Sequence, residues 1–213
     1  MGNLCYNCSD GRTQVLATQC LQHIFQIAQS REKIAKDDPG QRFPVILPGF
    51  LLNFCNESPD SVVAAGEVGF VDVVVENIIA TKTNDAVFNA SLNFLVCVAE
   101  DEKGHPSLLK CSKFPQALNH ILIHTTSPEV IETALELVRS ISENADLTLE
   151  LAKSDLCNTM IKHVSGKWKS EDFEAQRMDA CDLLVLILSH DSSMKHLYTN
   201  NDGELLQLFM GRI

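Results

Sequence analysis

The chain has 213 residues, and its 28 acidic residues against 17 basic ones give a formal net charge of −11 at pH 7. This balance argues against nucleic-acid phosphates as partners and favours basic partners or simple solubility. No uncharged apolar run of about 18 residues occurs, and the N-terminus has no secretory pattern, so we expect no direct membrane insertion and a cytosolic location.

The first quarter of the chain predicts short helices. Residues 1–8 resemble the last turns of a repeat helix whose beginning is missing, and two short helices follow at Thr13–Thr18 and Cys20–Ala28. A longer helix is expected over Phe43–Asn56. Pro48 is expected to kink it, because proline lacks the amide hydrogen that an internal hydrogen bond needs.

Helical segments continue along the rest of the chain. They are predicted over Ser58–Ile79, Asn84–Ala99, Ser107–Lys110, Phe114–His124, Glu129–Ser142, Leu147–Ala152, Leu156–Val164, Glu171–Ser189, Met194–Tyr198 and Glu204–Met210. Asn84 or Asp85 is expected to cap one of these helices. Prolines stand near three helix starts, where their missing amide hydrogen is tolerated, at Pro106, Pro115 and Pro128.

The segment Glu129–Ser142 has the clearest division into two faces. Its polar residues recur at steps of three and four and form one stripe, consisting of Glu129, Glu132, Glu136, Arg139 and Glu143. The positions 43 residues earlier hold Ala86, Asn89, Asn93, Val96 and Glu100. Another 43 residues earlier they hold Phe43, Ile46, Phe50, Asn53 and Glu57.

This period predicts an all-α fold, an armadillo-type right-handed α-solenoid of about four repeats with incomplete repeats at both ends. We expect one domain over 1–213, with approximate units 1–12, 13–57, 58–100, 101–143, 144–190 and 191–213. The basic loop Gly166–Lys169 stretches the fourth period to about 47 residues. That spacing makes Asp179 the counterpart of Glu132 and His190 the counterpart of Glu143.

The sequence offers no constellation for covalent catalysis. Cys5 and Cys8 form a CxxC pair, and His120 and His124 lie one helical turn apart, but neither pair has the further ligands of a zinc site. No glycine-rich phosphate loop and no nucleophile with a readable base occurs. We therefore expect no enzyme of covalent chemistry, no cofactor and no metal, and eight cysteines that are reduced core residues.

Two sets of residues on the repeat helices are candidate contacts. Asn53, Asn89 and Asn93 are able to bond to the backbone of an extended peptide, although capping of carbonyls within the stack explains them equally well. Three apolar residues beside the proline break are either ordinary core residues or an apolar pocket, namely Phe43, Ile46 and Phe50.

A series of short motifs follows in a characteristic order: Gly2–Tyr6, Asp10–Arg12, Leu52–Glu57, Ser142–Asn144, Leu149–Leu151, Asp182–Leu188 and His190–Met194. In order and spacing this series resembles the smg GDP-dissociation stimulators, an armadillo-repeat family that acts on small GTPases. The likeness covers essentially the whole chain but only part of the family's length. Cys97 departs from the family pattern, which tends to have asparagine there, and Pro48 is unusual in its helix.

The resemblance implies a cytosolic GDP-dissociation stimulator, a guanine-nucleotide exchange factor, that is also a chaperone of Rho-, Rap- or Ras-type GTPases with basic, prenylated tails. A lysine-rich tail would bind a groove formed by Asn53, Asn89, Asn93, Glu129, Glu132, Glu136, Arg139, Asp179 and Asp182. A prenyl chain would need a dry apolar pocket, for which Phe43, Ile46 and Phe50 are the candidates. The alternative is an armadillo adaptor or scaffold that binds peptides without promoting exchange, because one fold supports many functions.

Overall fold

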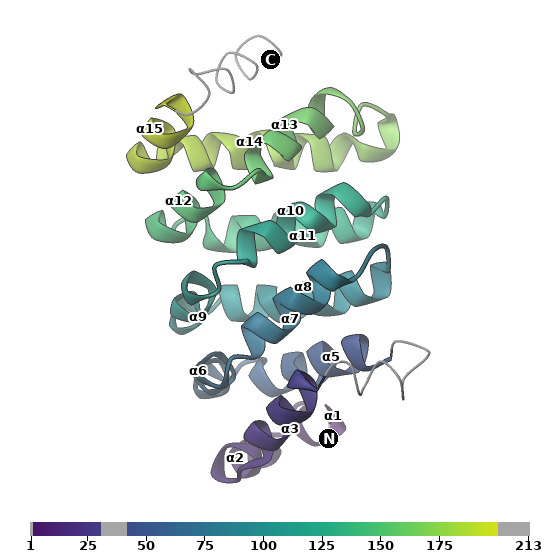
Figure 1. Ribbon diagram of the computed structural model, residues 1–213, viewed down its shortest axis with the longest axis vertical. Coiled ribbons are helices and arrows are strands. Elements are labelled where there is room, and N and C mark those ends of the chain that lie inside the picture. Colours follow the sequence, from purple (N-terminus) through teal and green to yellow (C-terminus); the bar gives the residue numbers. More distant parts are fainter. Residues whose placement is uncertain (1, 31–41, 200–213) are drawn as a thin grey trace. The chain divides into compact units, whose positions relative to one another are not determined.

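Every regular element of the described residues is helical, as the repeating apolar pattern predicts. The computed structural model describes residues 2–30 and 42–199, so the predicted helix Glu204–Met210 lies outside the described residues. No strand occurs within these two ranges. The all-α prediction is confirmed, and within each of the two compact units described below the short helices stack in layers, as in an α-solenoid of armadillo type (Figure 1).

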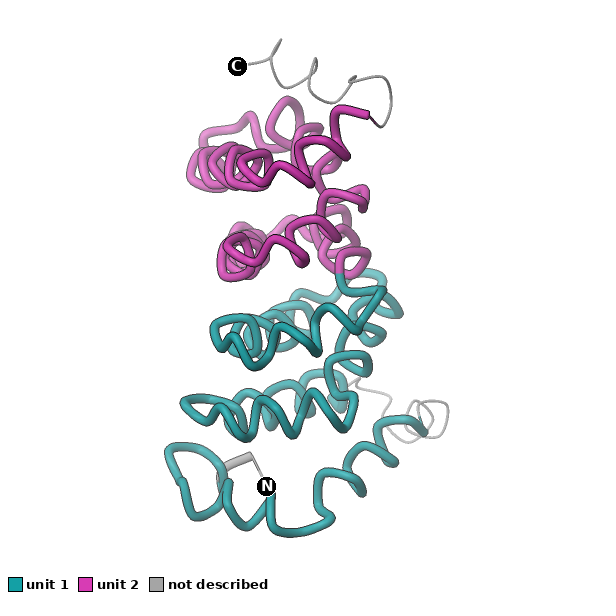
Figure 2. Tube along the Cα trace, turned by 90° about the vertical axis from the view of Figure 1, so that its left-hand side faces the viewer, with its two compact units in different colours: residues 1–114 teal, residues 115–213 magenta. Residues whose placement is uncertain are grey.

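The chain divides into two compact units, residues 1–114 and residues 115–213 (Figure 2). Unit 1 contains α1 (Gly2–Cys5), α2 (Ser9–Ala17), α3 (Cys20–Gln29), α5 (Phe43–Cys55), α6 (Pro59–Val68), α7 (Phe70–Ala80), α8 (Asp85–Ala99), η1 (Glu102–Gly104) and α9 (His105–Lys110). α10 (Phe114–His124) begins at the last residue of unit 1, and unit 2 continues with α11 (Pro128–Ile141), α12 (Ala145–Lys153), α13 (Leu156–Ser165), η2 (Glu171–Phe173), α14 (Glu174–Ser189) and α15 (Asp191–Thr199). The predicted single domain and its repeat boundaries stay predictions.

Side-chain caps define several helix starts. Asn84 Oδ1 accepts hydrogen bonds from the amides of Ala86 and Val87 at 3.2 and 3.3 Å, so the predicted cap of α8 is confirmed. Asn144 caps α12 in the same way, and Ser127 Oγ caps α11. Each cap satisfies amide groups that a helix start leaves without an internal partner.

A basic side chain satisfies a carbonyl at the end of α5, of α8 and of α11, which correspond to the third helices of successive repeats. The accepting carbonyls belong to Asn56, Ala99 and Ser142, which are spaced by 43 residues. Their donors are, in the same order, Arg12 Nη1 at 2.9 Å, His105 Nε2 at 2.9 Å and His190 Nε2 at 2.6 Å. Because the last carbonyls of a helix lack internal partners, these bonds tie each helix end to a neighbouring segment of its own unit.

Large apolar side chains fill the interior of each unit. In unit 1 the fully buried residues include Phe54, Phe70 and Phe88, and α5 continues through Pro48, which is itself buried. In unit 2 the single tryptophan, Trp168, is fully buried although it lies in a loop. Burying each such side chain stabilises the fold by about 1.5–3 kcal/mol. Within the described ranges, no helix has both the length and the apolar character needed to cross a membrane.

Close packing between α6 and α9 depends on a glycine. A methyl group added at Gly66 would lie 2.7 Å from Ser107 Cβ, closer than real contacts allow. The same group added at Gly49 in α5 would meet nothing within 4 Å. Both glycines lie inside helices, so replacement by alanine raises the helix propensity at either position. The two positions differ in the space available for the added methyl group.

We expect Gly66→Ala to lower the free energy of unfolding by about 1–3 kcal/mol, because overpacking outweighs the gain in helix propensity. Gly49→Ala should instead raise it by up to about 1 kcal/mol. Urea denaturation followed by circular dichroism measures both. Adding Ser107→Gly to Gly66→Ala should recover part of the loss, and equal effects of the two alanines would contradict the steric explanation.

Candidate functional site

Helix α11 exposes one charged stripe. Glu129, Glu132, Glu136 and Arg139 are exposed on it, and Glu143 is exposed just beyond its end; these five residues are called the α11 stripe below. The opposite side is buried and consists of Val130, Ile131, Ala134, Leu135, Leu137, Val138 and Ile141. Four carboxylates on one narrow face create a negative potential that attracts cationic segments.

Helix α14 packs against α11 within unit 2 (Figure 1). Arg139 Nη2 donates a hydrogen bond to Asp179 Oδ1 at 2.9 Å, and Gln176 Nε2 donates to the carbonyl of Pro128 at 3.4 Å. Asp182 is exposed nearly one turn beyond Asp179 on the same helix. Of the predicted groove residues, the structure thus brings Arg139 and Asp179 into direct contact.

The exposed positions of α14 correct the predicted spacing of about 47 residues. They include Ala175, Met178, Asp182, Val185 and Ser189, each 46 residues after one member of the α11 stripe. At the predicted spacing Glu136 would correspond to Leu183, which is fully buried. Asp179 and His190 are therefore not the counterparts of Glu132 and Glu143, because burial of the apolar side of α14 fixes its rotation.

Met178 and Val185 belong to this exposed face of α14, and the sequence analysis missed them. Their side chains are 61% and 56% exposed, and they lie four residues before and three residues after Asp182, on the same side of the helix. Matching the apolar positions of α14 to those of α11 would have found them. The face combines one carboxylate with apolar groups, which fits a segment that carries cations beside apolar side chains.

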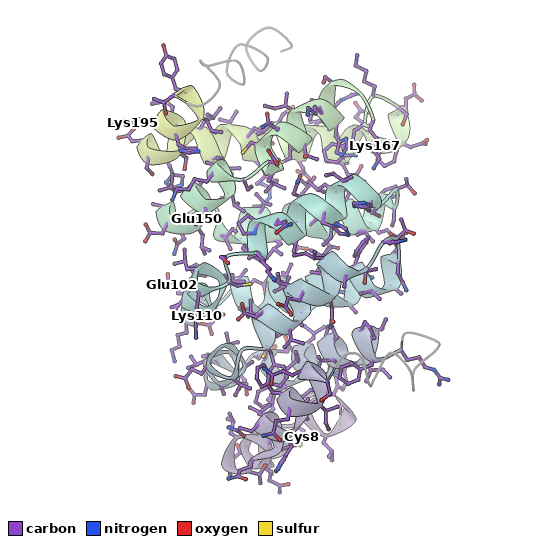
Figure 3. The ribbon with its side chains drawn as sticks, in the orientation of Figure 1. Cys8, Glu102, Lys110, Glu150, Lys167 and Lys195 are labelled. Carbon is purple, nitrogen blue, oxygen red and sulfur yellow. The ribbon has the colours of Figure 1, made fainter. Side chains whose placement is uncertain are left out.

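The loop ahead of α14 is anchored to the end of α10. Lys167 Nζ donates hydrogen bonds to the carbonyls of Thr125 at 2.6 Å and Leu122 at 3.4 Å, and His163 Nε2 also donates to Leu122 at 3.0 Å. The ring of buried Trp168 lies 5.0 Å from the His163 ring, centroid to centroid. These contacts hold the connection between α13 and α14 in place (Figure 3, where Lys167 is labelled).

Burial changes the proton affinity of Lys167 in this loop and of His163 in the last turn of α13. It lowers the pKa of His163 below its ordinary value of 6.5; the Lys167 charge lowers it further, and the hydrogen bond with Leu122 opposes the shift. Burial also lowers the pKa of Lys167 below its ordinary value of 10.5. The fold therefore favours neutral His163, because a second cation beside Lys167 is costly in a partly dehydrated place.

The three candidate asparagines lie on two helices of unit 1 that pack together, α5 and α8. Asn89 is exposed and Asn93 half-buried on α8, and Asn93 Nδ2 donates to Asn89 Oδ1 at 3.2 Å. Asn53 is half-buried on α5. Because these residues and the α11 stripe belong to different units, the prediction of one continuous groove stays a prediction.

The three residues of the predicted prenyl pocket differ in exposure along α5. Phe50 is almost fully buried and stacks on Phe54 with ring centroids 6.0 Å apart, whereas Ile46 is 61% exposed. Phe43 is half-buried at the start of the helix. Ile46 is thus the most exposed of the three and the most accessible to a ligand, and the pocket itself stays a prediction.

A separate hollow of about 300 Å³ lies on unit 1 between α6 and the η1–α9 segment. Val62, Val63 and Pro106 supply apolar wall, and Lys103 and Lys110 supply charge. Lys103 also lies 3.8 Å from a carboxylate oxygen of Asp60. None of the predicted site residues lines this hollow, and no pattern in the sequence indicated it.

Burial disfavours the thiolate form of several cysteines. It raises the pKa of Cys111 and of Cys157 to about 12 and that of Cys97 to about 11. In the CxxC pair, Cys5 is buried and Cys8 Sγ accepts a hydrogen bond from the Gly11 amide at the start of α2. The thiols of Cys97, Cys111 and Cys157 thus lack the depressed pKa of reactive cysteines, and Cys8 acts as a helix cap.

Comparison with known proteins confirms the resemblance that the ordered motifs indicated. The chain is 22% identical over 209 residues to the Rap1 GTPase-GDP dissociation stimulator 1-B of Xenopus laevis and 28% identical over 213 residues to the GTPase-GDP dissociation stimulator vimar of Drosophila melanogaster. These matches cover 97% and 93% of this chain but 34% and 32% of the relatives, so the chain spans about a third of their length. No protein-family model matches the sequence. No solved structure matches it either.

We expect the free energy of unfolding to fall as the pH drops below about 6.5, the ordinary pKa of histidine. Between that value and the lower pKa of folded His163, the unfolded chain binds a proton that the folded chain does not. Urea titrations followed by Trp168 fluorescence from pH 7.5 to 5.5 measure this slope. His163→Gln should make the slope shallower, and an unchanged slope in that variant would contradict the assignment.

Proposed function

We propose that this chain binds small GTPases and stimulates GDP dissociation from them. The supporting observation is the likeness to GTPase-GDP dissociation stimulators over 93–97% of the chain. Because the chain spans about a third of those proteins, the proposal includes the claim that this third retains a GTPase-binding surface. We further propose that it acts in the cytosol, on GTPases of Rho or Rap type with basic, prenylated tails, as exchange factor and chaperone.

In this proposal the four carboxylates of the α11 stripe, together with Asp179 and Asp182, attract the basic tail. The carboxylates are exposed or half-buried, so each contact with a lysine contributes only about 0.2–1 kcal/mol. Several contacts together raise the rate of encounter and select partners with clustered cations. Met178 and Val185 add apolar contact for side chains between the lysines.

Stimulated GDP release needs no covalent step. A factor that binds the nucleotide-free or distorted GTPase more tightly than the GDP-bound form shifts the population toward nucleotide release. No thiol then needs to act as a nucleophile, and the raised pKa values of Cys97, Cys111 and Cys157 suit a structural role for these three cysteines.

The chaperone part of the proposal requires a surface for the prenyl chain. Ile46 is a large exposed apolar residue on α5, and a methyl group added at the nearby Gly49 would meet nothing within 4 Å. Asn53 lies farther along the same helix and is half-buried. An apolar chain lying along this part of α5 would cover Ile46 and remove apolar area from water.

A second candidate is a peptide-binding adaptor without effect on nucleotide. The neighbouring amides of Asn89 and Asn93 favour it, because side-chain amides pair with the main chain of an extended peptide. Both candidates predict peptide capture, and only the first predicts faster GDP release.

We expect Glu132→Gln with Glu136→Gln to weaken binding of a lysine-rich GTPase tail roughly two- to tenfold at low salt, and less at high salt, because exposed charges are screened. Fluorescence anisotropy measures binding, and release of fluorescent GDP from Rho- and Rap-type GTPases measures exchange. The matched control is Glu102→Gln with Glu150→Gln, which removes the same charge from η1 and α12 (Figure 3). Unaccelerated GDP release with intact tail binding would favour the adaptor.

For the prenyl site we expect Ile46→Asp to lower retention of a prenylated tail while leaving the thermal unfolding midpoint within a few degrees of wild type, because Ile46 is exposed. Phe50→Asp should unfold unit 1 instead, since it places a charge in the core beside Phe54. Pull-down with farnesylated and unmodified tails, together with circular dichroism, separates the two effects. Unchanged retention by Ile46→Asp would remove α5 as the lipid site.

A further inference from the structure

Arg139 is the one basic member of the α11 stripe. The corresponding positions in the other third helices hold no basic residue: they are Asn53 in α5, Val96 in α8 and, at the observed spacing, Val185 in α14. The stripe is therefore acidic except where this guanidinium projects from it. Arg139 does not extend freely into solvent, because its Nη2 atom lies 2.9 Å from Asp179 Oδ1 on α14.

We propose that Arg139 competes with the basic partner segment for the carboxylate of Asp179 and thereby determines which basic segments bind to this face. This inference rests on the function proposed above and concerns how the same face is regulated. In the unbound chain Arg139 occupies Asp179, and a partner cation reaches that carboxylate only by displacing the guanidinium. The displaced Arg139 also leaves one positive charge beside the bound segment.

The geometry of the pair suits such a competition. The Arg139 and Asp179 side chains are 49% and 43% exposed, so solvent and an incoming cation reach both of them. An ion pair of this exposure is weak enough to exchange. A segment with one cation gains little by replacing it, whereas a segment with several cations also contacts Glu132, Glu136 and Asp182. The competition thus selects clustered cations over isolated ones.

The test is binding of fluorescein-labelled hexalysine, measured by anisotropy at low ionic strength. Arg139→Gln should tighten binding about two- to fivefold, the factor that an exposed ion pair corresponds to. The matched control is Lys153→Gln, which removes the same charge from α12, where Lys153 pairs with Glu150 at 2.6 Å and similar exposure. This control should change binding less than Arg139→Gln.

A double-variant cycle separates competition from net charge. In an Asp179→Asn background, Arg139→Gln should lose most of its gain, because the contested carboxylate is absent. An equal gain in both backgrounds, or an equal gain from Lys153→Gln, would overturn the proposal, and so would weaker binding by Arg139→Gln. If Glu132→Gln with Glu136→Gln weakens hexalysine binding while Arg139→Gln leaves it unchanged, the competition fails and tail binding stands. If neither the wild-type chain nor any variant binds hexalysine, both the competition by Arg139 and the proposed tail binding fail.

Discussion

The third helices α5, α8, α11 and α14 each bury one mainly apolar side, and the rest of the structure depends on that constraint. In α11 seven apolar residues are buried, and only a narrow edge remains for charge. Such a helix is stable only when neighbouring elements cover it, so the spacing between elements must be close and regular. Gly66 beside Ser107, and the carbonyls of Asn56, Ala99 and Ser142 with their basic donors, are local solutions to that requirement.

The two kinds of basic side chain in unit 2 differ in what they do because they differ in burial. Lys167 and His163 are partly dehydrated and donate to the end of α10, where they hold the loop before α14 and carry lowered pKa values. Arg139 is half-exposed and pairs with a carboxylate that water also reaches. The contacts of Lys167 and His163 position α14, whereas the Arg139–Asp179 pair is weak enough for a ligand to replace it.

The exposed edges of α11 and α14 offer different chemistry to a partner. The α11 stripe is nearly all carboxylate, whereas the face of α14 places Asp182 between Met178 and Val185. Charge governs the encounter and is sensitive to salt, while apolar contact adds affinity that salt does not screen. A cationic segment with apolar side chains or a lipid would use both, which agrees with the GTPase tails of the proposed function.

The sequence by itself determined the helices, the capping role of Asn84, the acidic edge of α11 and the likeness to GTPase-GDP dissociation stimulators. These follow from spacing along one helix or from the order of motifs, which are properties of the chain before it packs. Only the tertiary structure decided the rotation of α14, the burial of Trp168 and the pairing of Arg139 with Asp179. It also decided that Phe50 is buried while Ile46 on the same helix is exposed. Each of these depends on which neighbouring element covers a given face of a helix. The loop Gly166–Lys169 extends the period of 43 residues by three, and this number became clear only once the buried side of α14 was known.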